Sequence, residues 1–232
     1  MDIEKYACVA PQYYDQKIPP LLEEILAGND KRTLLECGCG DGSLLYALAK
    51  KGYLEHMNLL AVDLSKNRVK LVKEIDNRIS VQLDNVENLD TIRTNSVDVL
   101  VSTQVIEHVN DRKMIDSVYR VTRPNGKIYI TTVYKKWYAW YFYRNKDGWV
   151  LDPTHLREYK CDEELFRWIK PDRFKILSNE KSLQWFPVID FFVKRFSINN
   201  RELYNSSFFS AIRRLKIPIL GYYNWELVLQ KV

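Results

Sequence analysis

The stretch "LLECGCGDGSLL" at residues 34–45 holds three glycines and two cysteines within six positions. Cysteines this close together can ligate a metal ion or form a redox pair, and glycines this close together can form a turn whose backbone approaches a ligand. A zinc site would need a second cysteine pair, and the other two cysteines of the chain lie far from each other. We therefore interpret Cys37 and Cys39 as small packing residues within a glycine turn that binds a ligand.

Polar residues also follow three further predicted strands, at Asp63, at Asp84-Asn85 and at Ser102-Thr103-Gln104. In open parallel sheets ligands bind outside the carboxyl ends of the strands, so these residues are expected to share one site with the glycine turn. Asp63 can accept hydrogen bonds from ribose hydroxyls, or it can cap the helix that follows. Asp84 can accept a hydrogen bond from an adenine amino group, or it can belong to a plain turn. Glu36, directly before the glycines, can hold an ammonium group or fix the turn.

The elements that must position these residues alternate between strands and helices over the first 134 residues, which is typical of a parallel sheet with crossover helices. After an opening helix at 18–28, the sequence predicts strands at 33–37, 58–63, 79–83, 96–102 and 127–133 and helices at 43–52, 66–75 and 111–121. It then predicts an aromatic segment at 134–159, a helix at 161–170, a strand at 174–183, an irregular insertion at 185–220 and a closing strand at 222–232. The expected fold class is α/β, in a single domain over 1–232 with a core at about 30–133 and substrate-lid segments at about 134–159 and 185–220.

The chain has 232 residues and a net charge of +5, and its basic excess lies after position 134. No uncharged apolar run approaches the ~20 residues of a membrane-spanning helix, and the first residues lack the apolar stretch of a targeting peptide. We therefore expect a cytoplasmic protein without stable membrane insertion. The basic and aromatic distal half is compatible with binding to RNA, with binding to an anionic membrane surface or with a lid over an apolar substrate. It is equally compatible with a solvated basic surface over an aromatic core.

The segment "LLECGCGDG" resembles motif I of the class I S-adenosylmethionine-dependent methyltransferases, in which an acidic residue precedes G-x-G-x-G. The resemblance continues in order through "AVDLS", "VQLDNVENL", "VDVLVSTQVIEHV" and "VYRVTRPNGKIYITT", so it covers about residues 30–133. Together with "THLREYKCDEEL" at 154–165, it is most similar to the small-molecule branch that contains quinone-biosynthesis methyltransferases. One departure is Asn125, where relatives commonly have glycine, and asparagine tolerates left-handed backbone angles better than most residues.

The resemblance implies a Rossmann-like fold with a seven-stranded, mostly parallel sheet flanked by helices and carrying an aromatic lid insertion. It implies S-adenosyl-L-methionine as the cofactor and methyl transfer to an aromatic or lipid-like small molecule. Two alternatives stay open, namely methylation of RNA through the basic, aromatic distal half and a non-catalytic module that binds S-adenosylmethionine. The residues expected to bind the cofactor are Glu36, Gly38, Cys39, Gly40, Gly42, Asp63, Leu64, Asp84, Asn85, Val86, Thr103, Gln104 and Tyr14.

Two other ligands fit the sequence less well. A nicotinamide dinucleotide is associated with G-x-G-x-x-G, and its diphosphate would meet the acidic Glu36 and Asp41. Glu107 and His108 in "VIEHV" are placed like ligands of a divalent ion in small-RNA 3′-end methyltransferases. Such a site needs further Glu and His ligands nearby, and with three histidines in the whole chain we expect no metal.

His155 is the first candidate for acid–base catalysis, because imidazole can accept a proton near neutral pH and Arg157 and Glu158 are close by in the sequence. His155 can equally fix the lid through a backbone hydrogen bond. His108 is the second candidate, as a residue at the start of a helix that lines the pocket. The expected mechanism is direct transfer of the sulfonium methyl to an oxygen, nitrogen or carbon, with the reactants held in line and water excluded.

Overall fold

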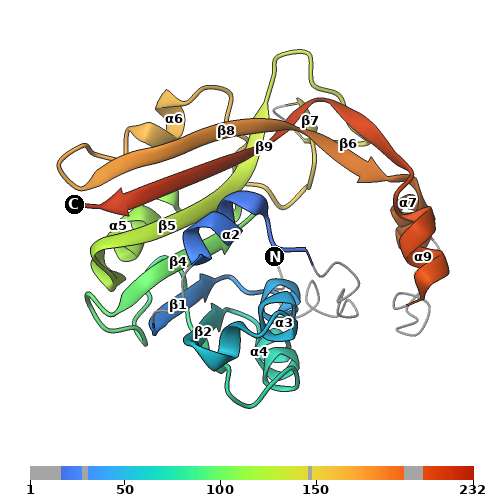
Figure 1. The fold of residues 1–232 in the computed structure, drawn as a ribbon. Helices are drawn as coiled ribbons and strands as arrows, with labels where there is room; N and C mark the ends of the chain where they lie inside the picture. The colour runs from blue at the N-terminus through green and yellow to red at the C-terminus, as the bar shows by residue number, and fades with distance from the viewer. Residues whose placement is uncertain (1–16, 28–30, 146–147, 196–205) are drawn as a thin grey trace.

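The computed structural model describes residues 17–27, 31–145, 148–195 and 206–232, and within them seven strands form one sheet in the order β3-β2-β1-β4-β5-β9-β8 (Figure 1). The strands are β1 (Arg32–Cys37), β2 (Met57–Asp63), β3 (Ser80–Leu83), β4 (Val97–Thr103), β5 (Thr122–Lys135), β8 (Phe174–Pro187) and β9 (Lys216–Lys231). Strands β1 to β5 pair in parallel, and β9 is antiparallel to both of its neighbours. The expected α/β fold with a mostly parallel, seven-stranded sheet is therefore confirmed.

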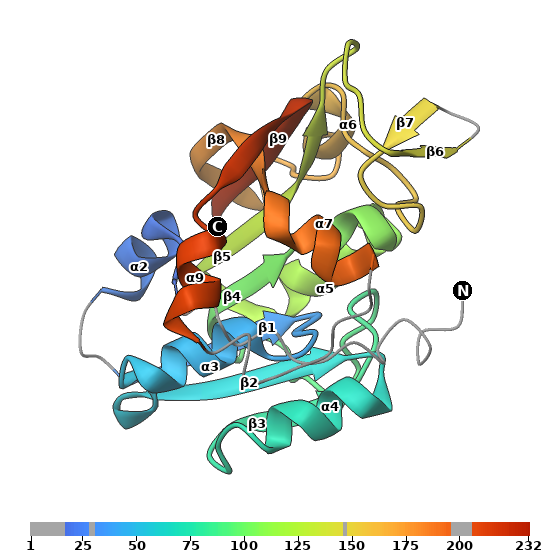
Figure 2. The same cartoon turned by 90° about the vertical axis from the view of Figure 1, so that its right-hand side faces the viewer.

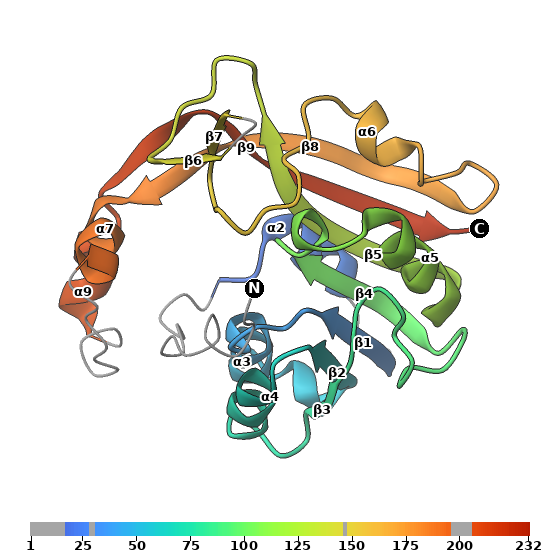
Figure 3. The same cartoon turned by 180° about the vertical axis from the view of Figure 1, so that it is seen from behind.

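Helices cover both faces of this sheet. Successive residues of its buried strands point to opposite sides, so each face carries apolar side chains that a helix covers. Leu34 packs in a core with helices α2 (Pro20–Leu26), α3 (Ser43–Lys50) and α4 (Lys66–Lys73), whereas Leu35 packs in a second core with α5 (Asp111–Val121). Figure 1 shows α2 in front of the sheet, and the view from behind in Figure 3 shows α5 on the opposite face. The carboxyl ends of β1, β2 and β4 are thereby held at one edge between two helical layers.

The helix expected at 161–170 is reduced to one turn, α6 (Glu163–Phe166). Beyond Arg167 the next two backbone amides pair with carbonyls three residues back: Trp168 N donates to Leu165 O and Ile169 N donates to Phe166 O, both at 3.0 Å. Such tight 3₁₀-type turns do not extend as an α-helix. The expectation of a longer helix was wrong for this reason.

The last two strands are longer than the sequence predicts, and the expectation of an irregular insertion at 185–220 was wrong. β8 runs to Pro187 and β9 begins at Lys216, so the two strands continue beyond the sheet as a paired arm. Helices α7 (Val188–Arg195) and α9 (Ser207–Ile212) lie at the far end of this arm (Figures 1 and 2). Pro187 and Pro218 interrupt the residue pattern by which a strand is recognised, which hid the arm from sequence reasoning.

A short hairpin and two 3₁₀-helices complete the described fold. Strands β6 (Tyr143–Asn145) and β7 (Gly148–Val150) form a separate hairpin after β5. The short 3₁₀-helices are η1 (Tyr53–Glu55), before β2, and η2 (Ile106–His108), directly after β4. Among the described helices, none is both long enough and apolar enough to cross a membrane.

Candidate cofactor and acceptor site

The glycine turn connects β1 to α3, and its three glycines have φ angles of +72°, +57° and +81° at Gly38, Gly40 and Gly42. A Cβ on Gly38 would lie 2.6 Å from Val105 Cγ2, and one on Gly42 would lie 2.5 Å from Ile75 Cδ1. These two glycines therefore allow close packing as well as left-handed backbone. At Gly40 the nearest atom to such a Cβ is the end of an arginine side chain at 3.8 Å, so there the backbone angle alone favours glycine.

Asp63 at the end of β2 holds the glycine turn in place. Its carboxylate accepts hydrogen bonds from Gly40 N and from Ser65 N, both at 2.9 Å, and one oxygen lies 3.8 Å from the Arg68 guanidinium. The cap of α4 is Ser65, whose Oγ accepts from Arg68 N at 3.2 Å. Asp63 is therefore not needed as the helix cap, and it lies in the wall of a cavity beside the turn.

Glu36 is a buried carboxylate, 3% exposed, and its Oε2 atom has no hydrogen-bond partner among the described residues. Burial, and then the charges of Asp41 and Asp63, raise the pKa of Glu36 well above its ordinary value. A positively charged ligand group beside Glu36 would pair the orphan oxygen and offset the neighbouring negative charge. This corner of the site therefore fits the ammonium of an amino-acid tail and disfavours a diphosphate.

A cavity of about 650 Å³ opens at the carboxyl ends of β1, β2 and β4. The structure brings most of the expected cofactor residues and one catalytic candidate to its wall, namely Glu36, Gly38, Cys39, Gly40, Asp63, Leu64, Val86, Thr103, Gln104 and His108. Gly42, Asp84, Asn85 and His155 do not line it, and Tyr14 lies outside the described residues. Sequence reasoning did not include the lining residues Lys17, Pro19, Asp41, Ser43, Leu44, Arg68, Val105, Val109, Tyr129, Thr131, Asn224 and Glu226.

Asp84 is occupied by its own loop. Its Oδ1 accepts from Asn85 N at 2.7 Å and from Asp90 N at 3.2 Å, and its Oδ2 accepts from both the amide and the hydroxyl of Thr91. A carboxylate with four partners in one loop has little capacity left for an adenine amino group. The turn role is what the structure assigns to Asp84, and Val86 two residues later lines the cavity instead.

Cys37 and Cys39 are buried free thiols beside the turn. Burial, more than any neighbouring charge, raises the pKa of both thiols above the ordinary value. Neither is a thiolate at neutral pH, and the thiolate is the form that ligates metals and attacks electrophiles. Their interpretation as small packing residues agrees with this environment.

One wall of the cavity is a polar network from β5 and β9. Tyr129 Oη donates to Glu226 Oε2 at 2.6 Å, and Asn224 Nδ2 donates to Glu226 Oε1 at 3.0 Å. Gln104 Nε2 donates to Asn224 Oδ1 at 3.1 Å, which joins the network to the end of β4. Burial and the adjacent Glu226 raise the pKa of Tyr129, so its hydroxyl stays protonated. The sequence signal for this wall is the alternation in "NWELVL", which puts Asn224 and Glu226 on one face of the strand.

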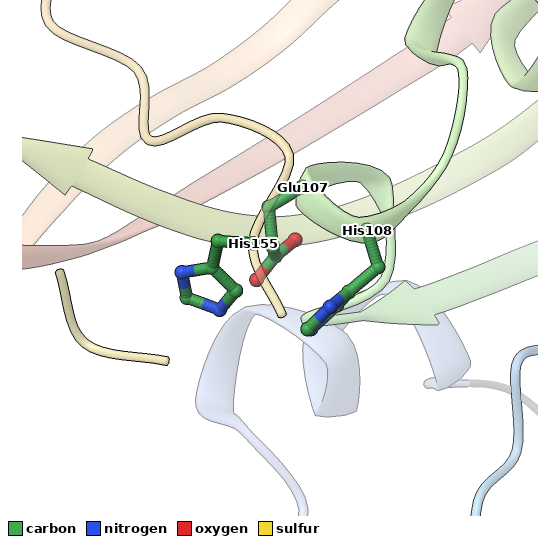
Figure 4. Close-up of side chains that lie close together, drawn as sticks. All are labelled: Glu107, His108 and His155. Atoms are coloured by element: carbon green, nitrogen blue, oxygen red, sulfur yellow. The ribbon is translucent and has the colours of Figure 1, made fainter. Parts of the chain in front are cut away.

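Glu107, His108 and His155 lie together at the edge of this cavity, and one ligand-type atom of each is within 4.8 Å of the others (Figure 4). Glu107 is fully buried. Its Oε2 accepts from Thr132 Oγ1 at 3.0 Å, and its Oε1 has no partner in the described parts of the chain. Burial raises the pKa of Glu107 to about 7. The cluster can therefore hold a proton on Glu107 or a divalent cation. The expectation of no metal relied on the lack of further ligands, and His155 is such a ligand.

The hydrogen bonds of His108 show that its Nδ1 atom carries a hydrogen. Thr154 Oγ1 lies 3.1 Å from His108 Nδ1 and donates to Asp152 Oδ1 at 2.7 Å. Because the hydroxyl has one hydrogen, it must accept from the Nδ1–H of His108. In the neutral ring the lone pair is therefore on Nε2. Burial, and then the adjacent His155, lower the pKa of His108, so the ring is neutral at pH 7.

His155 supports His108 from outside the cavity wall. The two rings meet edge to face with their centroids 4.7 Å apart. His155 Nδ1 lies 2.9 Å from Glu158 Oε1, and Lys135 Nζ lies 3.3 Å from the other oxygen of Glu158. His155 lines a smaller neighbouring pocket. His155, the first catalytic candidate, therefore lies behind His108, the second candidate, as seen from the cavity.

Comparisons with known proteins agree with this geometry. A family model described as a methyltransferase domain matches residues 35–130. The ubiquinone biosynthesis O-methyltransferase of Idiomarina loihiensis is 25% identical over 204 residues, which cover 79% of this chain and 79% of that protein. The enzyme of the same name from Nitrosomonas europaea is 28% identical over 150 residues, covering 57% of this chain and 62% of that protein. The match thus spans less than two thirds of the Nitrosomonas protein.

Solved structures share the fold at lower identity. A SAM-dependent methyltransferase from Methanosarcina mazei superimposes with a TM-score of 0.63 at 14% identity, covering 93% of this chain and 99% of that one. Geranyl diphosphate C-methyltransferase from Streptomyces coelicolor, solved with Mg²⁺, geranyl diphosphate and S-adenosyl-L-homocysteine, gives 0.58 at 12% identity and covers 91% and 77%. These likenesses therefore show a shared fold.

Proposed function

We propose that this S-adenosylmethionine-dependent methyltransferase methylates a hydroxyl oxygen of an aromatic or lipid-like small molecule. The observation that carries the proposal is the neutral His108, which has an unprotonated Nε2. His108 lines the same cavity as the glycine turn. A hydroxyl must lose its proton when its oxygen is methylated to a neutral ether, whereas a thiolate or a tertiary amine has no proton to lose. A positioned base beside the cofactor site therefore favours a hydroxyl acceptor.

S-adenosylmethionine, when bound, supplies an electrophilic methyl group on its sulfonium. Glu36 would accept hydrogen bonds from the ammonium of the amino-acid tail, because its orphan oxygen is buried in the cavity wall. Asp63 would accept from the ribose hydroxyls, as an acidic residue after the second strand does in related nucleotide sites. Leu64 and Val86 would supply apolar contact to the adenine, and the loop that presents Val86 is held by Asp84.

His108 would take the proton of the acceptor hydroxyl at Nε2. Its Nδ1–H stays bonded to Thr154, and Asp152 behind Thr154 favours the positive charge that the ring gains. His155 holds the ring from the side through an edge-to-face contact. Typical general-base contributions are about a hundredfold to ten-thousandfold in rate.

The polar wall of Tyr129, Asn224 and Glu226 would orient the acceptor. It combines a carboxylate with an amide and a phenol, so it can bond a second hydroxyl on the same ring as the reacting one. A ring with two neighbouring hydroxyls, such as a catechol, is the simplest acceptor with this pattern. None of the described residues in 134–159 or 185–220 lines the cavity, so the proposal assigns no lid role to them.

The test is formation of S-adenosylhomocysteine from S-adenosylmethionine with a series of catechols that carry alkyl chains of increasing length. We expect turnover with catechols, and a loss of at least about a hundredfold in kcat for the His108→Gln variant. His56→Gln is the matched control, because His56 contacts Tyr53 and does not line the cavity. All three proteins are assayed with EDTA and, separately, with Mg²⁺.

Three outcomes would overturn the proposal. An unchanged kcat for His108→Gln would remove the base. Activity that EDTA abolishes and Mg²⁺ restores would assign Glu107, His108 and His155 to a cation instead. Labelling of RNA in a cell extract, with no labelling of small molecules, would favour the RNA alternative over a small acceptor.

A further inference from the structure

The exposed aromatic side chains of the protein gather on one part of the fold. We define the aromatic arm as residues 136–145, 183–195 and 206–220, which comprise the loop after β5, strand β6, the distal parts of β8 and β9, and helices α7 and α9. Every large aromatic side chain that is exposed in the described chain lies in this arm. They are Trp137, Tyr138, Trp140, Phe142, Tyr143, Trp185, Phe192 and Phe208.

The degree of exposure is unusual for side chains of this size. Trp137 is 93% exposed and Phe208 is 70% exposed. The exposed aliphatic residues Leu215, Ile217 and Leu220 belong to the same arm. Soluble proteins rarely gather so many large exposed apolar side chains on one part of the fold unless that part binds something.

The arm is joined to the sheet by ordinary backbone pairing, which places its parts next to one another. Trp185 on β8 pairs with Pro218 on β9, and Trp140 N donates to Leu220 O at 3.2 Å. Gly221 has φ of +75°, and a Cβ there would lie 2.5 Å from Ala139 Cα. The loop after β5 is therefore packed directly on β9. Figure 1 shows the arm extending from the sheet to α7 and α9.

The arm is also strongly basic. It contains seven Lys or Arg residues and one acidic residue, Asp190, for a net charge of +6. Asp190 itself is paired with Arg213, with an N–O distance of 2.7 Å. Arg214 and Lys216 are exposed next to the apolar residues of β9. The arm therefore attracts an anionic partner and offers it apolar contact as well.

We propose that the aromatic arm docks the protein on the surface of an anionic lipid bilayer. Exposed Trp, Tyr and Phe next to Lys and Arg are the side chains that favour the bilayer interface, where rings enter the headgroup region and cations meet lipid phosphates. We expect peripheral docking, because none of the described helices is long enough and apolar enough to cross a membrane. The inference does not rest on the methyl acceptor of the proposed function, because it uses residues outside the cavity.

Two other partners fit the arm less well. A second copy of the chain would bring one +6 surface against another, and the like charges would repel. RNA would match the charge and could stack on the rings, but Leu215, Ile217 and Leu220 offer nothing that a base or phosphate binds. A bilayer matches the aliphatic, the aromatic and the cationic residues together.

The test is co-sedimentation of the full chain with vesicles of phosphatidylcholine alone and of phosphatidylcholine with phosphatidylglycerol. We expect binding to the anionic vesicles that weakens with salt, and little binding to the neutral ones. Trp137→Ser should reduce binding about tenfold, and Arg214→Gln about fivefold, since one cation near the surface contributes about that factor. Leu177→Ser is the matched control, because Leu177 is 42% exposed on β8 outside the arm.

Thermal unfolding of each variant checks that the fold is kept, since Trp137 and Arg214 are exposed and few contacts depend on them. Failure of the wild type to bind anionic vesicles at low salt would overturn the proposal. So would equal binding by Trp137→Ser and Leu177→Ser. Salt-sensitive binding of RNA without vesicle binding would assign the arm to RNA. A dimer in sedimentation velocity that Trp137→Ser abolishes, again without vesicle binding, would assign the arm to a second copy of the chain. Each of these results leaves the catechol assay unaffected.

Discussion

Replacing Glu107 by glutamine is expected to change how the stability of the protein depends on pH. Burial raises the pKa of Glu107 to about 7 from an ordinary 4.5. A raised folded-state pKa means that Glu107 contributes stability below its unfolded pKa, and that this contribution is lost as the pH rises through about 7. Integrated from about pH 5 to about pH 8.5, the wild type loses about 2.5 kcal/mol of unfolding free energy through this group. The Glu107→Gln variant has no such loss, because an amide does not titrate.

The assay is urea unfolding of both proteins in EDTA at several pH values between these limits, followed by circular dichroism. Glutamine keeps an oxygen for Thr132 Oγ1 and offers an NH₂ group in place of the orphan oxygen, so the fold is retained. Glu24→Gln is the control, since Glu24 is exposed on α2. A difference between Glu107→Gln and the wild type that stays constant across this pH range would refute the reasoning. Growth of the difference in favour of the wild type at high pH would also refute it.

Three further expectations follow from individual contacts. Gly42→Ala should lower the unfolding free energy by about 2 kcal/mol or more, because the added Cβ would meet Ile75 in addition to the strain of the left-handed backbone. Gly52→Ala should cost only about 1 kcal/mol, because nothing lies within 4 Å of its Cβ and only the backbone strain remains. Thermal unfolding of the two variants measures the difference. Lys231→Met should cost about 2 kcal/mol in urea unfolding, because Lys231 Nζ donates three hydrogen bonds of 2.7 to 2.9 Å that would be lost. The pH profile of kcat should be flat near pH 7 and fall below the ordinary histidine value of 6.5, because His108 has a lowered pKa and must be neutral to act; a fall centred above 7 would contradict this assignment.

The parts of the site that sequence reasoning could reach are those set by local chain order. Gly38 and Gly40 come just after β1 and Asp63 is the last residue of β2, and parallel pairing of β1 with β2 brings those strand ends together. Their neighbourhood follows from the α/β pattern alone. Glu36 was reachable for the same reason, as the last polar residue of β1 before the turn.

What sequence reasoning missed depends on contacts between distant segments. Glu226 reaches the cavity because β9 inserts beside β5 in the sheet, and Tyr129 bonds it across 97 positions of the chain. His155 joins His108 across a loop whose path no local pattern encodes. Asp84 was expected to bind the cofactor, but the hydrogen bonds that its loop would make were not readable from residue types.

The central claim is that the cavity beside the glycine turn binds S-adenosylmethionine through Asp63 and Glu36. Isothermal titration of S-adenosylmethionine into the wild type and into Asp63→Asn tests it most directly. Asp98→Asn is the control, because Asp98 likewise accepts a backbone amide hydrogen bond, from Thr33, but does not line the cavity. We expect measurable binding by the wild type and the control, and affinity at least about tenfold weaker for Asp63→Asn. Absence of binding by the wild type, or equal affinity in all three proteins, would contradict it.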